Sequence, residues 1–464
     1  MGSRLIRRPS AAKRFVSRSL VLLLLLGSYV GAPRTARAAN VTVNVDYNSP
    51  RQTLEGFGAS ATWVANDIDK FSAAKQTQIL DLLYKTGQPG AALSWVRVGS
   101  FLCDFSPSPG VYDWNHWGIQ SEMRWLQRVN ASYGVNRYMV STWSPPAWMK
   151  DNNSCTNGGH VLPQYYADLA ALKVQWLQNA RAQLGFEAQV ESVQNEPNMR
   201  TTYDSCEWTT SEISSFVANN LQPALAASGL TARIMAPEPA YYSNFDASWG
   251  SPILSNAAAR AAIQIVATHG YGRTDDFSKP CASCATYNKP IWQTEDSNLD
   301  GRYNGSIDDG MTWAAEISKA LGGGRFSAWF YWWVMDLNGG NEGLIHADPS
   351  TDSFQVPKRL YVLGHFSRFM RPGSVVLGST SGDSTLLVTA VRPTSGNVAV
   401  VLANTGRNSH TVTVNLNGLT SPPASVTPHR TSATENQAPL APVGVTSGSF
   451  TITVPSKTVV TVVG

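Results

Sequence analysis

Two glutamates have the setting that a pair of catalytic acids needs. Glu196 closes the apolar run Val190–Glu196 in the string QNEP, and Glu295 closes the run Pro290–Glu295 in the string WQTE. If their carboxyl groups lie about 5–5.5 Å apart, one can attack an acetal carbon while the other protonates the leaving oxygen and later activates water. Repulsion between two such carboxylates raises the pKa of the acid towards neutral pH. The predicted chemistry is hydrolysis of a glycosidic bond through a covalent intermediate.

A third glutamate, Glu238, lies between Pro237 and Pro239 at the end of another apolar run. We expect it to support the site rather than to contact substrate. No cofactor is predicted, because acetal hydrolysis by two carboxylates requires none.

The chain has five cysteines, so at least one thiol is free or pairs with another molecule. The sequence Cys281-Ala-Ser-Cys284 predicts a small loop disulfide, because no second CxxC or spaced histidine pair completes a metal site. We expect no metal. Cys155 and Cys206 each follow a predicted active-site strand, which favours a second bridge between them.

Fifteen tryptophans are a high number for this length, and many lie near the ends of the apolar runs. Indole faces stack on the C–H faces of sugar rings, so these residues favour a carbohydrate substrate. Trp332 and Trp333 are consecutive on a predicted strand and should face opposite sides, and we expect Trp332 to face the site. The candidates near strand ends are Trp63, Trp143, Trp148, Trp292, Trp329, Trp332 and Trp333.

Eight short apolar runs alternate with amphipathic helical segments such as Ala73–Tyr84 and Ser211–Ala227. Eight strand–helix units are the number that forms a (β/α)8 TIM barrel, with catalytic residues at the carboxyl ends of the strands. A doubly wound sheet is the alternative, but no glycine-rich phosphate loop follows any run. The runs are Leu54–Ser60, Ser94–Ser100, Arg137–Trp143, Val190–Glu196, Arg233–Glu238, Ile265–Tyr271, Pro290–Glu295 and Ala328–Asp336.

After the helical segment Lys358–Met370, the pattern changes to alternating apolar and polar residues. This alternation predicts an antiparallel β-sandwich. The run Val41–Val45 alternates in the same way, so the sandwich should contain strands from both chain ends. The expected parts are a signal peptide (1–38), an N-terminal sandwich strand (39–54), the catalytic barrel (55–371) and the β-sandwich side domain (372–464).

The first 38 residues combine basic residues, the apolar run Leu20–Leu26 and the small-residue site Ala36-Arg37-Ala38. This is the pattern of a secretory signal, so we expect an extracellular protein that is not membrane-bound after cleavage. Eight basic residues lie in this segment, which leaves 28 basic and 32 acidic residues in the remainder. That balance excludes the basic surface of a nucleic-acid binder. We expect a monomer whose partner is a polysaccharide substrate.

Eight strings in chain order resemble glycoside hydrolase family 30, a family of retaining TIM-barrel glycosidases. The resemblance covers nearly all of the chain after residue 38. The strings are EGFG (55–58), VRVGS (96–100), WSPPAWMK (143–150), VQNEP (193–197), APEP (236–239), THGYG (268–272), WQTE (292–295) and LGHFSRFMRPG (363–373).

The resemblance implies roles for individual residues. Glu196 matches the acid/base and Glu295 the nucleophile. Asn195 matches the residue that binds the sugar 2-hydroxyl, and Arg97 matches an arginine near the nucleophile. The remaining matches are Tyr271, which hydrogen-bonds the nucleophile, with His269 close by, and the aromatic walls Trp143 and Trp332.

Within the family, WSPPAWMK, SPIL (251–254) and HGYG most resemble the bacterial endo-xylanase branch, which implies an endo-β-1,4-xylanase. Glucuronoxylan-specific members carry an arginine just after the aromatics of the eighth strand, whereas this chain reads Val334-Met335-Asp336-Leu337. Asp336 would repel a uronate, so no strict dependence on glucuronate is expected. The alternatives are an endo-β-1,6-galactanase or β-1,6-glucanase, a non-catalytic carbohydrate-binding protein on the same fold, and a metal-dependent hydrolase.

Overall fold

The structure is a computed structural model that describes residues 39–464, except residues 273, 300 and 338–339. The expected signal peptide, residues 1–38, lies outside the described residues. In the described part of the chain, no helix has both the length and the apolar character to cross a bilayer.

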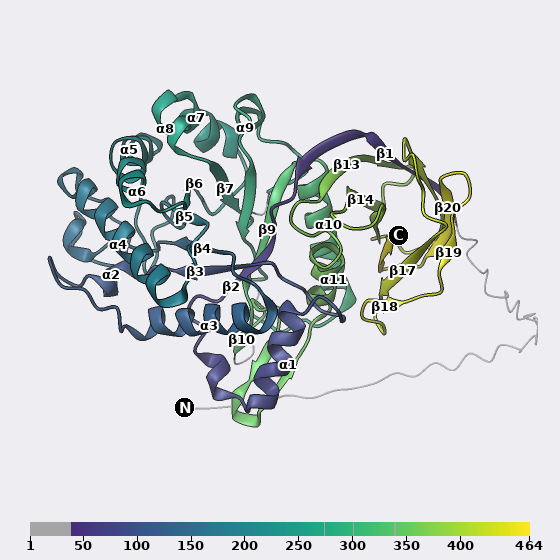
Figure 1. Ribbon diagram of the computed structural model, residues 1–464, viewed down its shortest axis with the longest axis horizontal. Coiled ribbons are helices and arrows are strands. Elements are labelled where there is room, and N and C mark those ends of the chain that lie inside the picture. The colour runs from purple at the N-terminus through teal and green to yellow at the C-terminus, as the bar shows by residue number, and fades with distance from the viewer. Residues whose placement is uncertain (1–38, 273, 300, 338–339) are drawn as a thin grey trace, which may run out of the picture. The chain divides into compact units, whose positions relative to one another are not determined.

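Eight parallel strands close into a barrel in chain order, as predicted (Figure 1). Each expected apolar run overlaps one barrel strand, and only the last strand begins before its run, at Phe326 instead of Ala328. The strands are β2 (Gly56–Ser60), β3 (Trp95–Gly99), β4 (Tyr138–Ser141), β5 (Val190–Ser192), β6 (Arg233–Pro237), β7 (Ile265–His269), β8 (Ile291–Glu295) and β9 (Phe326–Trp333).

Helices follow the strands and cover the barrel (Figure 1). The helix α1 (Ala73–Tyr84) has the predicted bounds, because Ser72 accepts a hydrogen bond from the backbone of Lys75 and the apolar face is buried. The others are α2 (Leu102–Phe105), α3 (Trp117–Tyr133), α4 (Tyr166–Leu184), α5 (Thr210–Phe216), α6 (Gln222–Ser228), α7 (Ser251–Ser255), α8 (Ala257–Ala262), α9 (Ala282–Thr286), α10 (Ile307–Gly322) and α11 (Lys358–Ser367).

The segment predicted as one helix over Ser211–Ala227 begins with a capping box between Thr209 and Glu212. A π-helical turn at Val217–Leu221 then joins α5 to α6. The predicted segment is therefore helical, but it is not a uniform α-helix.

Large apolar side chains fill the barrel interior, among them Trp95, Trp292 and Phe330. A Cβ at Gly58 would come within 2.3 Å of the Phe330 ring, so this position requires glycine. Trp292 is fully buried and donates to Glu55 at 3.1 Å, at the end of the barrel opposite the carboxyl ends of the strands. Its candidacy as a sugar-stacking residue is therefore wrong. Trp329 is also fully buried, where it packs on Trp313.

The sandwich sheet contains strands from both chain ends, as predicted. The N-terminal strand β1 (Ala39–Thr53) lies antiparallel to β13 and parallel to β16. The other sandwich strands are β13 (Val375–Ser381), β14 (Leu386–Arg392), β15 (Ala399–Asn404), β16 (His410–Asn417), β17 (Ser425–Thr431), β18 (Ala438–Pro439), β19 (Val443–Gly444), β20 (Ser449–Val454) and β21 (Thr458–Val463). A further small sheet follows the barrel, formed by β10 (Asp336–Leu337), β11 (His346–Asp348) and β12 (Ser353–Gln355).

The disulfide Cys281–Cys284 is confirmed, but the bridge expected between Cys155 and Cys206 is wrong. Cys155 pairs with Cys103, whose Cα lies 5.9 Å away, and Cys206 is a buried free thiol. The Cys103–Cys155 bridge joins the chain that follows β3 to the chain that follows β4. The pairing depends on how these loops meet, which the spacing of the cysteines does not encode.

This pairing predicts the outcome of a thiol titration. The native protein, without reductant, should show no rapidly reacting thiol, because burial raises the pKa of Cys206 to about 12 and covers its sulfur. Denaturation without reductant should release one thiol per chain, and peptide mapping should locate it at Cys206. A mapped peptide in which Cys206 is joined to Cys155 would contradict the pairing.

Candidate active site

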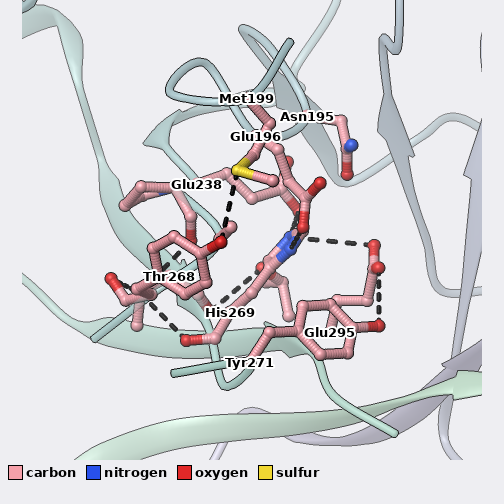
Figure 2. A network of polar contacts seen from close by, with 12 residues as sticks. Asn195, Glu196, Met199, Glu238, Thr268, His269, Tyr271 and Glu295 are labelled. Carbon is pink, nitrogen blue, oxygen red and sulfur yellow. Dashed lines mark hydrogen bonds and ion pairs between the residues drawn. The ribbon is translucent and has the colours of Figure 1, made fainter. Parts of the chain in front are cut away.

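Glu196 and Glu295 meet at the carboxyl end of the barrel. Glu295 is the last residue of β8, and Glu196 lies in the turn that follows β5. The backbone of Glu196 has a φ of 46°, an uncommon left-handed conformation for a non-glycine residue that is typical of functional sites. One oxygen from each carboxylate and a ring nitrogen of His269 all lie within 4.8 Å of one another (Figure 2).

The carboxylate of Glu295 is held on both oxygens. The buried Arg97 guanidinium donates to one, and the Tyr271 hydroxyl donates to the other at 2.8 Å. Burial raises the pKa of Glu295, the charges of His269 and Arg97 oppose the rise, and the charge of Glu196 adds to it, so that the pKa lies above its usual value. The arrangement fixes the orientation of this carboxylate, as a nucleophile needs.

His269 lies between the glutamates of the site. Its Nδ1 is 3.0 Å from Glu196, and its Nε2 is 3.4 Å from Glu238 and 3.8 Å from Glu295. Burial opposes a charge on the ring, but the carboxylates of Glu295, Glu196 and Glu238 outweigh burial and raise the pKa of His269 to about 9. The ring is therefore an imidazolium at neutral pH.

Glu238 is fully buried and supports other residues of the site, as expected. Burial favours its neutral form, but the charge of Arg97 and the bonds from His269 and Ser192 hold the pKa of Glu238 at about 2. Its carboxylate also accepts a hydrogen bond from Ser141 at 3.0 Å. This permanent negative charge compensates the buried Arg97 and positions both Arg97 and His269.

Asn195 precedes Glu196 in the chain and is also anchored by Arg97. The side-chain carbonyl of Asn195 accepts a hydrogen bond from Arg97 Nη2 at 2.7 Å. Because Arg97 already donates to the side-chain carbonyl of Asn195, the side-chain N–H group is the part of Asn195 that can donate a hydrogen bond to a ligand hydroxyl.

Aromatic rings form the wall of the cavity beside the carboxylates. Trp143 and Trp332 both line it, and the Arg97 guanidinium lies 4.7 Å and 5.6 Å from their ring centres. Trp63 packs against both rings, with centroid distances of 5.1 Å and 5.9 Å. The structure thus brings together all eight residues that the sequence analysis assigned to the site.

The expectation that Trp332 and Trp333 face opposite sides is wrong. Both line the cavity, and their rings stack with 5.1 Å between centroids. The pairing register between β2 and β9 shifts next to these residues, since Ala59 pairs with Tyr331 and Ser60 with Trp333. A bulge of this kind breaks the strict alternation of side chains along a strand.

The cavity, of about 500 Å³, has further lining residues. Trp63 and Trp333 are among the aromatic candidates from the sequence, and the sequence singled out none of the others. Several follow strand ends, and Met199 and Tyr203 lie in the loop that continues from the QNEP string. Glu342 had no sequence signal, because its loop has no regular pattern. The added residues are Trp63, Met199, Tyr203, Ala240, Tyr241, Leu299, Trp333 and Glu342.

Asp336, which we expected to repel a uronate, does not line this cavity. Its carboxylate accepts a hydrogen bond from the backbone N–H of Glu342 at 2.8 Å. Asp336 therefore orders its own loop, and the acidic side chain that faces the cavity on this loop is Glu342.

Glu196, His269 and Glu295 have the donor atoms of a metal site. The Arg97 guanidinium already supplies a positive charge to Glu295, and acetal hydrolysis by two carboxylates requires no metal ion. We therefore expect full activity after treatment with EDTA and gel filtration, measured as initial rates on the best substrate. A melting curve with and without EDTA is the control for a structural ion. Loss of activity that zinc or calcium restores would support a metal-dependent hydrolase.

A parallel barrel with two carboxylates and an aromatic-walled cavity at its carboxyl end is the architecture of a TIM-barrel glycosidase. The model of glycosyl hydrolase family 59 matches residues 54–368, and the model of the glycosyl hydrolase family 30 beta sandwich domain matches residues 373–462. Because the family 59 model covers more than half of the chain, the chain belongs to this group of glycosyl hydrolases. The match of the sandwich domain confirms the resemblance to family 30.

Comparison with individual proteins also finds glycoside hydrolases. Glucuronoxylanase XynC of Bacillus subtilis (strain 168) is 25% identical, over 96% of this chain and 95% of that protein. Endo-1,6-beta-D-glucanase of Neurospora crassa is 26% identical, over 83% of this chain and 85% of that protein. The structure of the family 30 subfamily 8 xylanase Xyn30A from Clostridium acetobutylicum is 26% identical and superposes with a TM-score of 0.74, over 91% of this chain and 99% of that one.

Proposed function

We propose that this glycoside hydrolase is a secreted, retaining endo-β-glycanase that uses Glu295 as nucleophile and Glu196 as acid/base. The observation that carries the proposal is the close approach of the two carboxylates, with oxygens within 4.8 Å. Retaining glycosidases have carboxyl groups about 5–5.5 Å apart, whereas inverting enzymes separate them by about 6.5–9.5 Å to admit a water molecule.

The geometry supports a double displacement. Glu295 attacks the anomeric carbon, the bond to the leaving oxygen breaks, and Glu196 donates its proton to that oxygen. Glu196, now ionised, then removes a proton from water, which attacks the same carbon and releases Glu295. Arg97 and Tyr271 hold the attacking carboxylate during both steps. We expect the side-chain amide of Asn195 to donate a hydrogen bond to the sugar 2-hydroxyl, and the anchoring of its carbonyl by Arg97 supports this role.

For the substrate we propose β-1,4-xylan without strict dependence on glucuronate. The names of two similar proteins, the glucuronoxylanase and the family 30 xylanase, favour xylan. The stretch Val334–Leu337 contains no arginine to bind a uronate. A β-1,6-linked glucan or galactan is the second candidate, favoured by the similarity to an endo-1,6-beta-D-glucanase.

An extracellular location is part of the proposal. It is supported by the signal-type pattern of residues 1–38 and by the two disulfides, which form in oxidising compartments. A carbohydrate-binding protein without activity is disfavoured, because both carboxylates and their supporting residues are present.

The test is product analysis on xylan, β-1,6-glucan, β-1,6-galactan and aryl β-glycosides. We expect short oligosaccharides of mixed length from xylan, and NMR should show the β-anomer as the first product. Release of the α-anomer first would contradict retention. Cleavage of a β-1,6-glycan but not of xylan would replace the proposed substrate while leaving the mechanism intact.

A further inference from the structure

Glu342 presents an acidic side chain to the cavity from the loop that follows β9. Two backbone hydrogen bonds hold it: its N–H donates to Asp336, and its carbonyl accepts from the N–H of Trp333 at 3.3 Å. The neighbouring Leu344 also donates to the carbonyl of Trp333, at 2.9 Å. The loop therefore places Glu342 beside the stacked rings of Trp332 and Trp333.

The carboxylate of Glu342 is half-buried and makes no ion pair or side-chain hydrogen bond with any of the residues that the structure describes. In contrast, the carboxylates of Glu196, Glu238 and Glu295 all have protein partners. A half-buried carboxylate without a partner in a substrate cavity has its acceptor capacity available for a ligand.

The strand order of the barrel puts Glu342 on the side of the nucleophile. The loop of Glu342 follows β9, which pairs with β8, the strand that ends at Glu295, whereas Glu196 follows β5, which is not a neighbour of β9 in the barrel. Burial and the carboxylates of Asp336 and Glu295 raise the pKa of Glu342 to about 7. The loop after β5, on the side where the leaving group is protonated, contributes Glu196, Met199 and Tyr203. The ionisable groups around Glu342 are Asp336 on its own loop, Glu295 at the end of β8, and Glu196, Tyr203, Tyr241 and Tyr271, which line the same cavity.

We propose that Glu342 is a specificity-determining residue on the glycone side of the cavity, where it accepts hydrogen bonds from hydroxyls of neutral sugars and repels uronic acid substituents. This inference rests on the proposed function, since the glycone side is defined by Glu295 as nucleophile. From the sequence, Asp336 is expected to repel a uronate. In the present proposal Glu342 repels it, and Asp336 positions Glu342.

The effect should depend on pH. Above about pH 7 Glu342 is ionised and repels a carboxylate on the substrate, whereas below that value it is neutral and the repulsion weakens. Like charges placed together in a binding site disfavour the wrong partner strongly. We expect ionised Glu342 to lower kcat/KM for an acidic substrate on the order of 10–100-fold relative to its neutral counterpart.

The experiment compares wild type, Glu342→Gln and Glu342→Lys on two oligosaccharides of equal length. One is the neutral oligosaccharide that wild type cleaves in the product analysis, and the other carries one uronate on the glycone side. The measurement is the ratio of kcat/KM for neutral and acidic substrates at pH 5 and pH 8. Asp168→Asn, which removes an exposed carboxylate on α4 outside the cavity, is the matched control.

We expect the wild-type ratio to rise on the order of tenfold or more from pH 5 to pH 8, and the Asp168→Asn ratio to follow it. Glu342→Gln should show a lower ratio with little pH dependence, and Glu342→Lys should favour the acidic substrate. An unchanged ratio in both Glu342 variants, with normal melting curves, would overturn the inference. Failure of wild type to cleave any β-glycan would instead overturn the proposed function.

Discussion

Glu295→Ala is expected to lower kcat on the best polysaccharide substrate on the order of 10⁶-fold, which is the range that removal of a covalent nucleophile reaches. The loss should be large because no neighbour can take over the attack. Glu238 is fully buried beneath the site, and Glu196 is needed as the acid. Asp168→Asn on α4 is a matched control for the loss of one carboxylate, and it should retain wild-type activity.

Covalent labelling gives a second readout that does not depend on residual activity. A 2-deoxy-2-fluoro glycoside with a good leaving group should inactivate the wild-type enzyme, and mass spectrometry should locate the sugar on Glu295. A label on any other carboxylate, or inversion in the first product, would show that Glu295 is not the nucleophile.

The pH profile of the wild-type enzyme should also report the ionisation of Glu295 as the nucleophile. The nucleophile must be ionised, and burial raises the pKa of Glu295 above its usual value. On the acidic side of the pH profile, kcat/KM should therefore rise with an apparent pKa that is higher than the ordinary glutamate pKa of about 4.3. The direction follows because the fraction of ionised Glu295 increases as the pH rises through its pKa.

Much of the fold is encoded in local patterns and could be predicted from the sequence. Each barrel strand is a short apolar run between turns, and the alternation in Val41–Val45 correctly predicts its place in the sandwich. The positions of Glu196 and Glu295 follow from the same logic, because the carboxyl ends of parallel barrel strands meet at one face.

The errors arise where side-chain direction or loop packing decides the outcome. Trp292 is the second residue of β8 and fills the barrel interior at the end opposite the cavity, whereas Trp332 lies near the carboxyl end of β9 and lines the cavity. At Trp333 a register shift breaks the alternation of side chains along the strand. The partner of Cys155 is set by two loops meeting in space, and so is the position of Glu342. None of these features has a period or a spacing that a sequence could reveal.

The last prediction concerns Glu196, whose two roles can be separated in one variant. As acid it must be protonated when the glycosidic oxygen leaves, and as base it must be ionised when water attacks. Glu196→Ala should lower kcat/KM on polysaccharide by roughly 10²–10⁴-fold or more, because general acid–base catalysis typically contributes that much. The limb of the pH profile that reports the general acid should disappear in the same variant.

A dinitrophenyl glycoside needs no proton for its leaving group, so Glu196→Ala should still form the glycosyl-enzyme on Glu295. The intermediate should accumulate because no base activates water. Azide needs no base, so its addition should restore turnover and give a β-glycosyl azide. Polysaccharide cleavage should not be rescued, since its leaving oxygen still lacks a proton.

Glu238→Gln is the matched control for this experiment. Glu238 holds Arg97 and His269 in place, its pKa lies at about 2, and its backbone, not its carboxylate, contacts Glu196. Its loss should reduce activity by displacing these residues, and azide cannot repair that defect. Rescue of Glu238→Gln but not of Glu196→Ala would move the acid/base role to Glu238. Rescue confined to Glu196→Ala, with the β-glycosyl azide as product, would establish Glu196 as the acid/base.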